Sequence, residues 1–196
     1  MDGHTMNINR RHFLKAALAA MPLALKSGAA EIPPSPGNRP GKGFRVGANG
    51  DRYGEELRIM GGRFDLKVSA KDTGGELCIY DTFRQSKGGP ALHRHHSQDE
   101  WFYVIRGEFI VQVGGETMRL HPGDSAFAPR KVPHAFAKVS EDEGHLLIVF
   151  QPAGSIEDFF RQMAAFGPAI PKDQEALLKD LFEKHGMEMV GPPLEF

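Results

Sequence analysis

The sequence predicts a mainly β protein, built as one antiparallel barrel or jelly roll and followed by two helices. Many short apolar runs follow one another from residue 56 onward, and glycine or proline turns separate them. No internal repeat is visible in the 196 residues, so we expect a single barrel unit. After Pro152 the apolar residues recur at helical spacing instead.

The individual runs have the patterns of strands. Phe64, Leu66 and Val68 alternate with polar residues, which is typical of a strand with one buried face. Residues 101–105 are continuously apolar and aromatic, as in a strand covered on both faces. Pro122-Gly123 fits the centre of a type II turn between two strands. The remaining strands are expected at residues 76–83, 109–113, 116–120, 124–128, 134–139 and 145–151.

Two helices are expected after the barrel. The first has Ser155 as its N-cap, Asp158 three residues on, and Gly167-Pro168 as its end. The second runs from Lys172 or Asp173 to His185, before Gly186, and is expected to bury Leu177, Leu178, Leu181 and Phe182. We therefore predict a barrel over residues 44–154 and a helical extension over 155–196. The extension would cap one end of the barrel or contribute to a dimer interface.

The N-terminal residues have the pattern of an export signal. Residues 9–15, with Arg10 and Arg11, closely resemble the twin-arginine motif, and the apolar stretch 16–25 is too short for a membrane span. Small residues up to Ala30 suit a signal peptidase, which predicts a signal peptide at 1–30 and a Pro/Gly-rich linker at 31–43. The protein is then expected in the periplasm, with the twin-arginine export machinery as a partner. The alternative is an ordinary basic amphipathic helix.

Charge and cysteine content exclude some functions. The net charge is −1 and no basic stripe is present, which argues against a nucleic-acid partner. The single cysteine, Cys78, allows no internal disulfide; it is expected to be a buried, inert thiol, although it could face the barrel cavity.

Histidines and a carboxylate are grouped in one stretch of the chain. His93 and His95 are two residues apart, so on a strand both imidazoles project from the same face. Glu100 follows at a distance that allows the chain to turn and present the carboxylate to the same pocket. Such a ligand set suits Fe, Mn, Co, Ni or Zn. A further imidazole, His134, lies downstream after Pro133.

The array His93-x-His95-x4-Glu100-x6-Gly107, followed by Pro122-Gly123-Asp124 and Pro133-His134, resembles the two motifs of the cupin superfamily. Within it the chain is similar to small, single-domain quercetin-dioxygenase-like cupins. The resemblance implies a jelly roll in which His93, His95, Glu100 and His134 bind one divalent transition metal.

Fe, Mn, Ni or Co is expected first, with Zn or Cu as alternatives. Four such ligands leave two adjacent octahedral positions for substrate, O2 or water. The competing interpretations are a histidine-rich surface loop and a barrel that binds no metal.

Other residues near the motifs need assignment. His96 points to the opposite face of the strand from His95, His121 precedes a turn, and His145 begins a strand after an acidic loop, so none is expected to be a ligand. Lys138 stands where the cupin pattern often has asparagine.

Alternation sends Phe102 and Val104 inward from Glu100, and Phe136 inward from His134. These three side chains are expected to line an apolar substrate pocket, or to be ordinary core.

The resemblance implies a metal-dependent dioxygenase for a small enolic, phenolic or flavonoid-like compound. Glu100 would be both a metal ligand and the general base. A metal-dependent isomerase or lyase would use the same ligands, and a non-catalytic protein that binds a small molecule or the metal is the third possibility. The resemblance also makes a homodimer one option, because cupins of this kind are often dimers, but the sequence does not disclose the oligomeric state.

Overall fold

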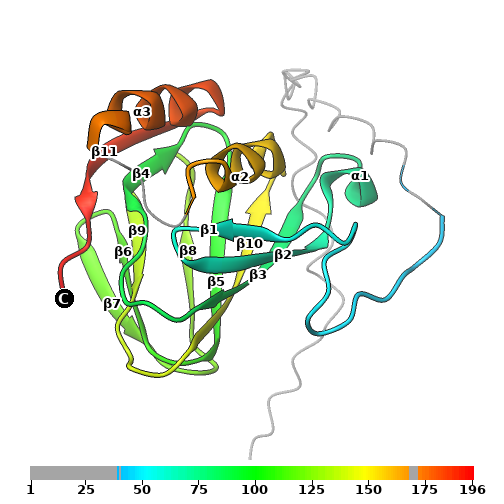
Figure 1. Ribbon diagram of the computed structural model, residues 1–196, viewed down its shortest axis with the longest axis horizontal. Coiled ribbons are helices and arrows are strands. Elements are labelled where there is room, and N and C mark those ends of the chain that lie inside the picture. Colours follow the sequence, from blue (N-terminus) through cyan, green and yellow to red (C-terminus); the bar gives the residue numbers. More distant parts are fainter. Residues whose placement is uncertain (1–38, 40, 168–171) are drawn as a thin grey trace, which may run out of the picture. The chain divides into compact units, whose positions relative to one another are not determined.

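The computed structural model describes residues 39, 41–167 and 172–196. The predicted signal peptide at 1–30 and most of the predicted linker at 31–43 lie outside the described residues. Within the described part, the predicted fold class is confirmed: two antiparallel sheets with eleven strands form a jelly roll, accompanied by a few helices (Figure 1).

The first sheet has six strands, in the spatial order β1 (Leu57–Ile59), β2 (Gly62–Val68), β3 (Cys78–Arg84), β10 (Gly144–Gln151), β5 (Asp99–Arg106) and β8 (Ser125–Ala128). The second has five strands, in the order β11 (Met187–Pro193), β4 (Ala91–His95), β9 (His134–Lys138), β6 (Phe109–Val113) and β7 (Glu116–Leu120). Both sheets mix strands that are distant in the sequence, which is how residues from separate motifs come together.

Side-chain alternation decides which face of each strand is buried. In β10, Leu146, Ile148 and Phe150 are buried, whereas Leu147 and Val149 between them are partly exposed. In register beside them, β5 buries Glu100, Phe102 and Val104. The core therefore lies on the inward face of the sheet, and Glu100 occupies a core position among apolar residues.

Two glycines of the motifs are required by the backbone. Gly107 ends β5 with φ +80°, and a Cβ there would lie 2.9 Å from Ser140 Oγ and 3.0 Å from Gly144 Cα. Gly123 has φ +96°, as the predicted type II turn demands. A residue with a side chain would be strained at either position, because both have positive φ. The glycine spacing of the motifs therefore reflects the tight connections around β5 and β8.

The helices follow the predicted positions closely. α2 spans Ile156–Ala164, and a 3-10 turn η1 (Lys172–Gln174) leads into α3 (Glu175–Lys184). A short helix α1 (Ala70–Thr73), which the periodicity did not predict, precedes β3. α2 packs against β1 and α3 packs against β11, at the same end of the two sheets (Figure 1). In the described ranges, no helix combines the length and the apolar character that crossing a bilayer requires.

Two details of the C-terminal prediction were wrong. Leu177 is 58% exposed, because α3 buries only Leu178, Leu181 and Phe182. Ser155 is the N-cap of α2, as predicted, and its hydroxyl contacts His185 Nδ1 at 2.8 Å instead of a backbone N–H of the helix.

The extension 155–196 is also not purely helical, because β11 follows α3 and pairs with β4 as an edge strand of the second sheet. Its short alternation, interrupted by Gly191 and the prolines that follow, gives a weak strand signal.

Candidate metal centre

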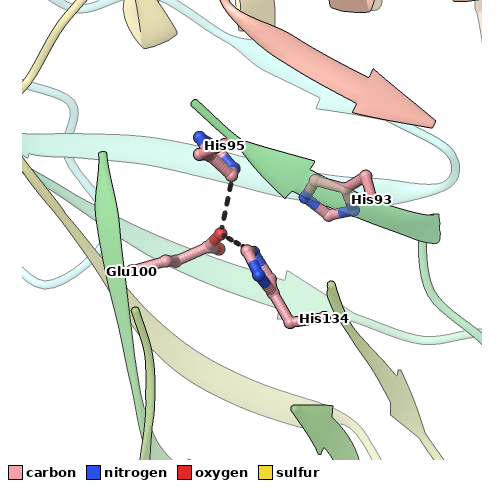
Figure 2. A group of neighbouring side chains, drawn as sticks. All are labelled: His93, His95, Glu100 and His134. Atoms are coloured by element: carbon pink, nitrogen blue, oxygen red, sulfur yellow. Dashed lines mark hydrogen bonds and ion pairs between the residues drawn. The ribbon is translucent and has the colours of Figure 1, made fainter. Parts of the chain in front are cut away.

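The four predicted ligands lie on three strands that the fold brings together (Figure 2). His93 and His95 project from the same face of β4, and His134 begins β9 as the register partner of His93. Glu100 comes from β5 in the other sheet, so the cluster joins the two sheets.

The cluster is compact and buried. One ligand atom from each residue can be chosen so that all four atoms lie within 4.8 Å of one another. Glu100 Oε2 lies 2.9 Å from His134 Nε2 and 3.3 Å from His95 Nε2, while the ring centroids of His93 and His134 are 4.8 Å apart. All four residues are at most 7% exposed. The histidine-rich surface loop is therefore excluded.

Each imidazole is oriented by a hydrogen bond from Nδ1, the ring nitrogen that points away from the centre of the cluster, to an oxygen atom. His93 Nδ1 donates to the Ala91 carbonyl at 2.7 Å, and His134 Nδ1 donates to the Val132 carbonyl at 2.9 Å. His95 Nδ1 donates to Gln98 Oε1 at 3.0 Å. Because Nδ1 carries the proton in each ring, the three Nε2 atoms are the ones that face the centre, and such outer partners are typical of metal-binding histidines.

The protonation states are set by burial and by mutual charge. Burial alone would raise the pKa of Glu100, but the hydrogen bond from His134 and the charges of His134 and His95 bring it well below its ordinary value. Burial would lower the pKa of His134, and its hydrogen bond to Glu100 raises it instead. Burial, with the charges of His134 and His95, lowers the pKa of His93 to about 3. Glu100 is thus ionised and His93 is neutral, the forms in which both bind metals.

These residues fit a divalent metal ion. His95 Nε2 is buried and makes no hydrogen bond within the described residues. A buried carboxylate with three imidazoles is costly unless a cation joins them. Two or three imidazoles with one carboxylate form a donor set for Fe, Mn, Co, Ni, Cu or Zn. In this site His93, His95, Glu100 and His134 would hold the ion.

The cluster opens on one side into a cavity of about 610 Å³. His93, His95 and Glu100 line this cavity, whereas His134 lies behind them and is fully buried. Most other lining residues are apolar, and they include Phe159 and Met163 of α2 and Leu178 of α3. The two C-terminal helices therefore form part of the cavity wall. This agrees with the expectation that they cap one end of the barrel.

The three expected pocket residues are all buried but differ in position. Phe136 lines the cavity. Phe102 and Val104 are not among the lining residues; both are fully buried, and the Phe102 ring packs 5.6 Å from the Phe136 ring between their centroids. Both side chains point to the same inward face of β5 as Glu100, as alternation predicts. They lie further along the strand, where side chains fill the interior of the barrel.

The other histidines lie apart from the cluster, as predicted. His96 and His121 are exposed. His145 contacts Asp81 and stacks on Phe83 with 4.1 Å between ring centroids.

Two further residues that the sequence singled out are structural. Cys78 is fully buried, burial raises the pKa of its thiol, and it does not line the cavity. Lys138 is also buried; its Nζ donates to the carbonyls of Gln85 and Ser140 at 2.8 Å, and burial lowers its pKa. The lysine therefore anchors a loop at the position where cupins often have asparagine.

Sequence reasoning missed several residues of the site. Gln98, Arg84 and Met187 contribute to it, and none is a defining position of the motifs. Gln98 lies between His95 and Glu100, so its place inside the motif was an available signal. Arg84 was detectable only by extending the inward alternation of Tyr80 and Thr82 along β3. Met187 is placed by the long-range pairing of β11.

Comparison with known proteins supports the same family. The family model for the cupin domain matches residues 82–150. An uncharacterized protein of Streptomyces coelicolor is 38% identical over 60 residues, which are 31% of this chain and 56% of that protein. An uncharacterized protein of Methanocaldococcus jannaschii is 27% identical over 67 residues, 34% of this chain and 54% of that one. The chain thus spans about half the length of the curated relatives it matches.

Among solved structures, an RmlC-like cupin from Shewanella frigidimarina is 30% identical, with a TM-score of 0.48; the match covers 60% of this chain and 96% of that one. The cupin-domain match includes His93, His95, Glu100 and His134. It also falls on the central strands of the jelly roll described above. The domain match and the jelly-roll topology together identify a cupin domain over residues 82–150.

Proposed function

We propose that this cupin is a metal-dependent dioxygenase for a small enolic, phenolic or flavonoid-like compound. The observation that carries the proposal is the buried cluster of three imidazoles and one carboxylate, exposed on one side to a mostly apolar cavity. Four protein ligands leave coordination positions free for a substrate. A bound divalent metal would lower the pKa of a substrate hydroxyl and supply the redox chemistry with O2.

The chain's own residues would bind and orient the substrate. Phe136, Phe150 and Phe182 offer apolar surface for an aromatic body, and the C-terminal helices exclude water from that side. Glu100 is the carboxylate of the cluster, so its Oε atoms are placed to accept the proton of a hydroxyl at the centre. Its low pKa in this arrangement favours the ligand role and makes it a weak base, which differs from the raised pKa that a strong general base needs.

The test is O2 uptake by metal-loaded protein with a panel of phenols, enols and flavonols. We expect O2 consumption with at least one compound, and its loss by orders of magnitude in Glu100→Ala. Glu116→Ala, which changes an exposed carboxylate on β7, is the matched control and should leave the rate unchanged. Turnover without O2 would indicate the isomerase or lyase instead. Tight binding without turnover would indicate a binding protein.

We also propose that the chain is exported by the twin-arginine route, on the basis of the Arg10-Arg11 motif. Replacement of both arginines by lysine should keep the protein in the cytoplasm of its host, uncleaved, as seen by fractionation and mass spectrometry. Equal export of the variant would contradict the proposal. The twin-arginine route resembles a pathway that exports proteins after they have folded. The metal could then be loaded in the cytoplasm, before the protein meets competing Cu and Zn in the periplasm.

A further inference from the structure

Arg84 places a buried cation in the wall of the cavity, apart from the metal cluster. It is the last residue of β3, on the inward face after Tyr80 and Thr82, and it is only 5% exposed. Its register partners on the two neighbouring strands are both glycines, Gly62 and Gly144. A Cβ at Gly62 would lie 3.3 Å from the Arg84 Cγ, so the glycine makes room for the arginine stem.

The Arg84 guanidinium has no anionic partner among the described residues. Its Nε is buried without a hydrogen bond, and no ion pair with a described carboxylate is formed. Burial lowers the pKa of Arg84 to about 10, with no carboxylate acting in the opposite direction, so the group is still charged at neutral pH. A buried charge without a partner is costly, so we expect its replacement by an apolar side chain of similar size to be neutral or stabilising. An anionic ligand in the cavity would supply the missing charge.

Two aromatic rings hold the guanidinium at the cavity wall. Its Cζ lies 5.5 Å from the centroid of Phe64 and 5.0 Å from that of Phe136, within the range of cation–π contacts. All three residues line the cavity. The rings offer no hydrogen-bond acceptors, so the N–H groups remain free for an anion that enters from the cavity.

The position of Arg84 relative to the metal cluster defines the shape of the ligand. Phe136 lies two residues beyond His134 on β9, roughly 7 Å along the strand. The guanidinium packs on Phe136, whereas the imidazole of His134 contacts Glu100. A ligand could therefore place one oxygen at the cluster and an acidic group at Arg84, with its apolar body beside Phe136.

We propose that Arg84 binds a carboxylate of the substrate, so that the cavity selects aromatic or apolar acids over their neutral analogues. This deepens the proposed function by naming the substrate class. The binding preference itself requires neither O2 nor a metal. With a divalent cation and ionised Glu100 at the centre, an anionic ligand would also offset the net positive charge of the cation, Glu100 and Arg84 together.

The test compares 3-phenylpropionate with 3-phenylpropionamide, which has the same shape and no charge. Binding is measured by calorimetry on chelator-treated protein, so that no metal competes for the carboxylate. The wild type should bind the acid about 10- to 100-fold more tightly than the amide, as expected for a hydrogen-bonded charged pair. Arg84→Met should abolish this preference, and Arg84→Lys should keep part of it. Arg58→Met, which changes an exposed arginine on β1, two strands away from β3 in the same sheet, is the matched control and should keep the preference.

Equal affinity of the wild type for the acid and the amide would overturn the proposal, and so would an acid preference that persists in Arg84→Met. Thermal unfolding of Arg84→Met tests the alternative that Arg84 serves only the stability of the fold. In that case the substitution would lower the Tm. We expect its Tm to stay the same or rise. If Arg84→Met does not fold, the proposal is overturned. An acid preference without O2 uptake would leave the role of Arg84 intact while removing the dioxygenase.

Discussion

Gln98 determines how His95 is presented to the centre. Its Oε1 accepts from His95 Nδ1 at 3.0 Å, and its Nε2 donates to the carbonyls of Pro152 at 3.0 Å and Ala153 at 2.6 Å. The amide is therefore oriented by the backbone just before α2, so that only its oxygen can face the imidazole. This bond keeps the proton on Nδ1 and leaves Nε2 free for a metal ion.

Replacement of Gln98 by alanine should weaken metal binding about 10- to 100-fold, since partners of this type contribute that much to affinity. Competition with a chromophoric chelator measures the change. Gln112→Ala is the control, because Gln112 donates to Gly114 in the β6–β7 hairpin and contacts no imidazole. An unchanged metal affinity in Gln98→Ala would show that His95 needs no such support.

At the scale of elements, α1 is held by a charged network. Ser69 caps the helix together with Asp72, and Arg52 donates two hydrogen bonds to the Asp72 carboxylate at 2.9 and 3.0 Å. These bonds, with the Ser69 N–H, hold the pKa of Asp72 below its ordinary value. The folded state therefore binds its proton less readily than the unfolded chain does.

This depressed pKa predicts a pH dependence of stability. The contribution of Asp72 is fully present above its unfolded pKa of about 4 and is lost as the pH falls through the lower folded value. Asp72→Asn should lower the Tm at pH 7 by roughly 2–4 °C, as for the loss of a cap near 1 kcal/mol. The Tm difference from the wild type should shrink as the pH is lowered below about 4. A Tm difference that is constant across this range would contradict the assignment.

The strand β4 depends on β11 for its position. β4 pairs with β9 only at His93 and His134, whereas β11 pairs with His93, Arg94 and His95 in succession. The Arg94–Glu188 ion pair adds a second link between these two strands. Two of the four candidate ligands are thus placed largely by a strand that lies almost 100 residues further along the chain.

Truncation after Gly186 should therefore lower both stability and metal affinity. Met187 is 1% exposed and lines the cavity, and loss of one such side chain alone costs about 2–5 kcal/mol. Chemical unfolding and chelator competition measure the two effects. Truncation after Pro193 removes only the residues beyond β11 and serves as the control. Full metal affinity without β11 would show that β9 alone suffices to hold β4.

At the scale of the whole molecule, local patterns predicted most of the fold and the centre of the site. Strand alternation and turn glycines are local, so they predicted the jelly roll and the inward direction of Glu100 and Phe136. Spacing alone placed His93 and His95 on one face of a strand, with Glu100 within reach. The convergence of these three residues with His134 was implied by the resemblance to the cupin motifs.

The missed features share a physical cause, namely pairing and packing between distant segments. β11 is a strand because β4 offers it an edge, not because its own sequence alternates strongly. Leu177 was wrongly predicted to be buried, because the buried face of α3 depends on where β11 and the cavity lie. The cavity role of Arg84 depends on two glycines on other strands and on rings from β2 and β9.

The central claim is that four buried side chains bind one divalent metal ion at the wall of an apolar cavity. Elemental analysis of protein purified from its own host tests it most directly, with His134→Ala beside the wild type and His121→Ala as an exposed-histidine control. We predict about one transition-metal ion per chain in the wild type and the control, and far less than one in His134→Ala. A wild type that carries no metal and takes up none on reconstitution, or an undiminished metal content in His134→Ala, would contradict the account.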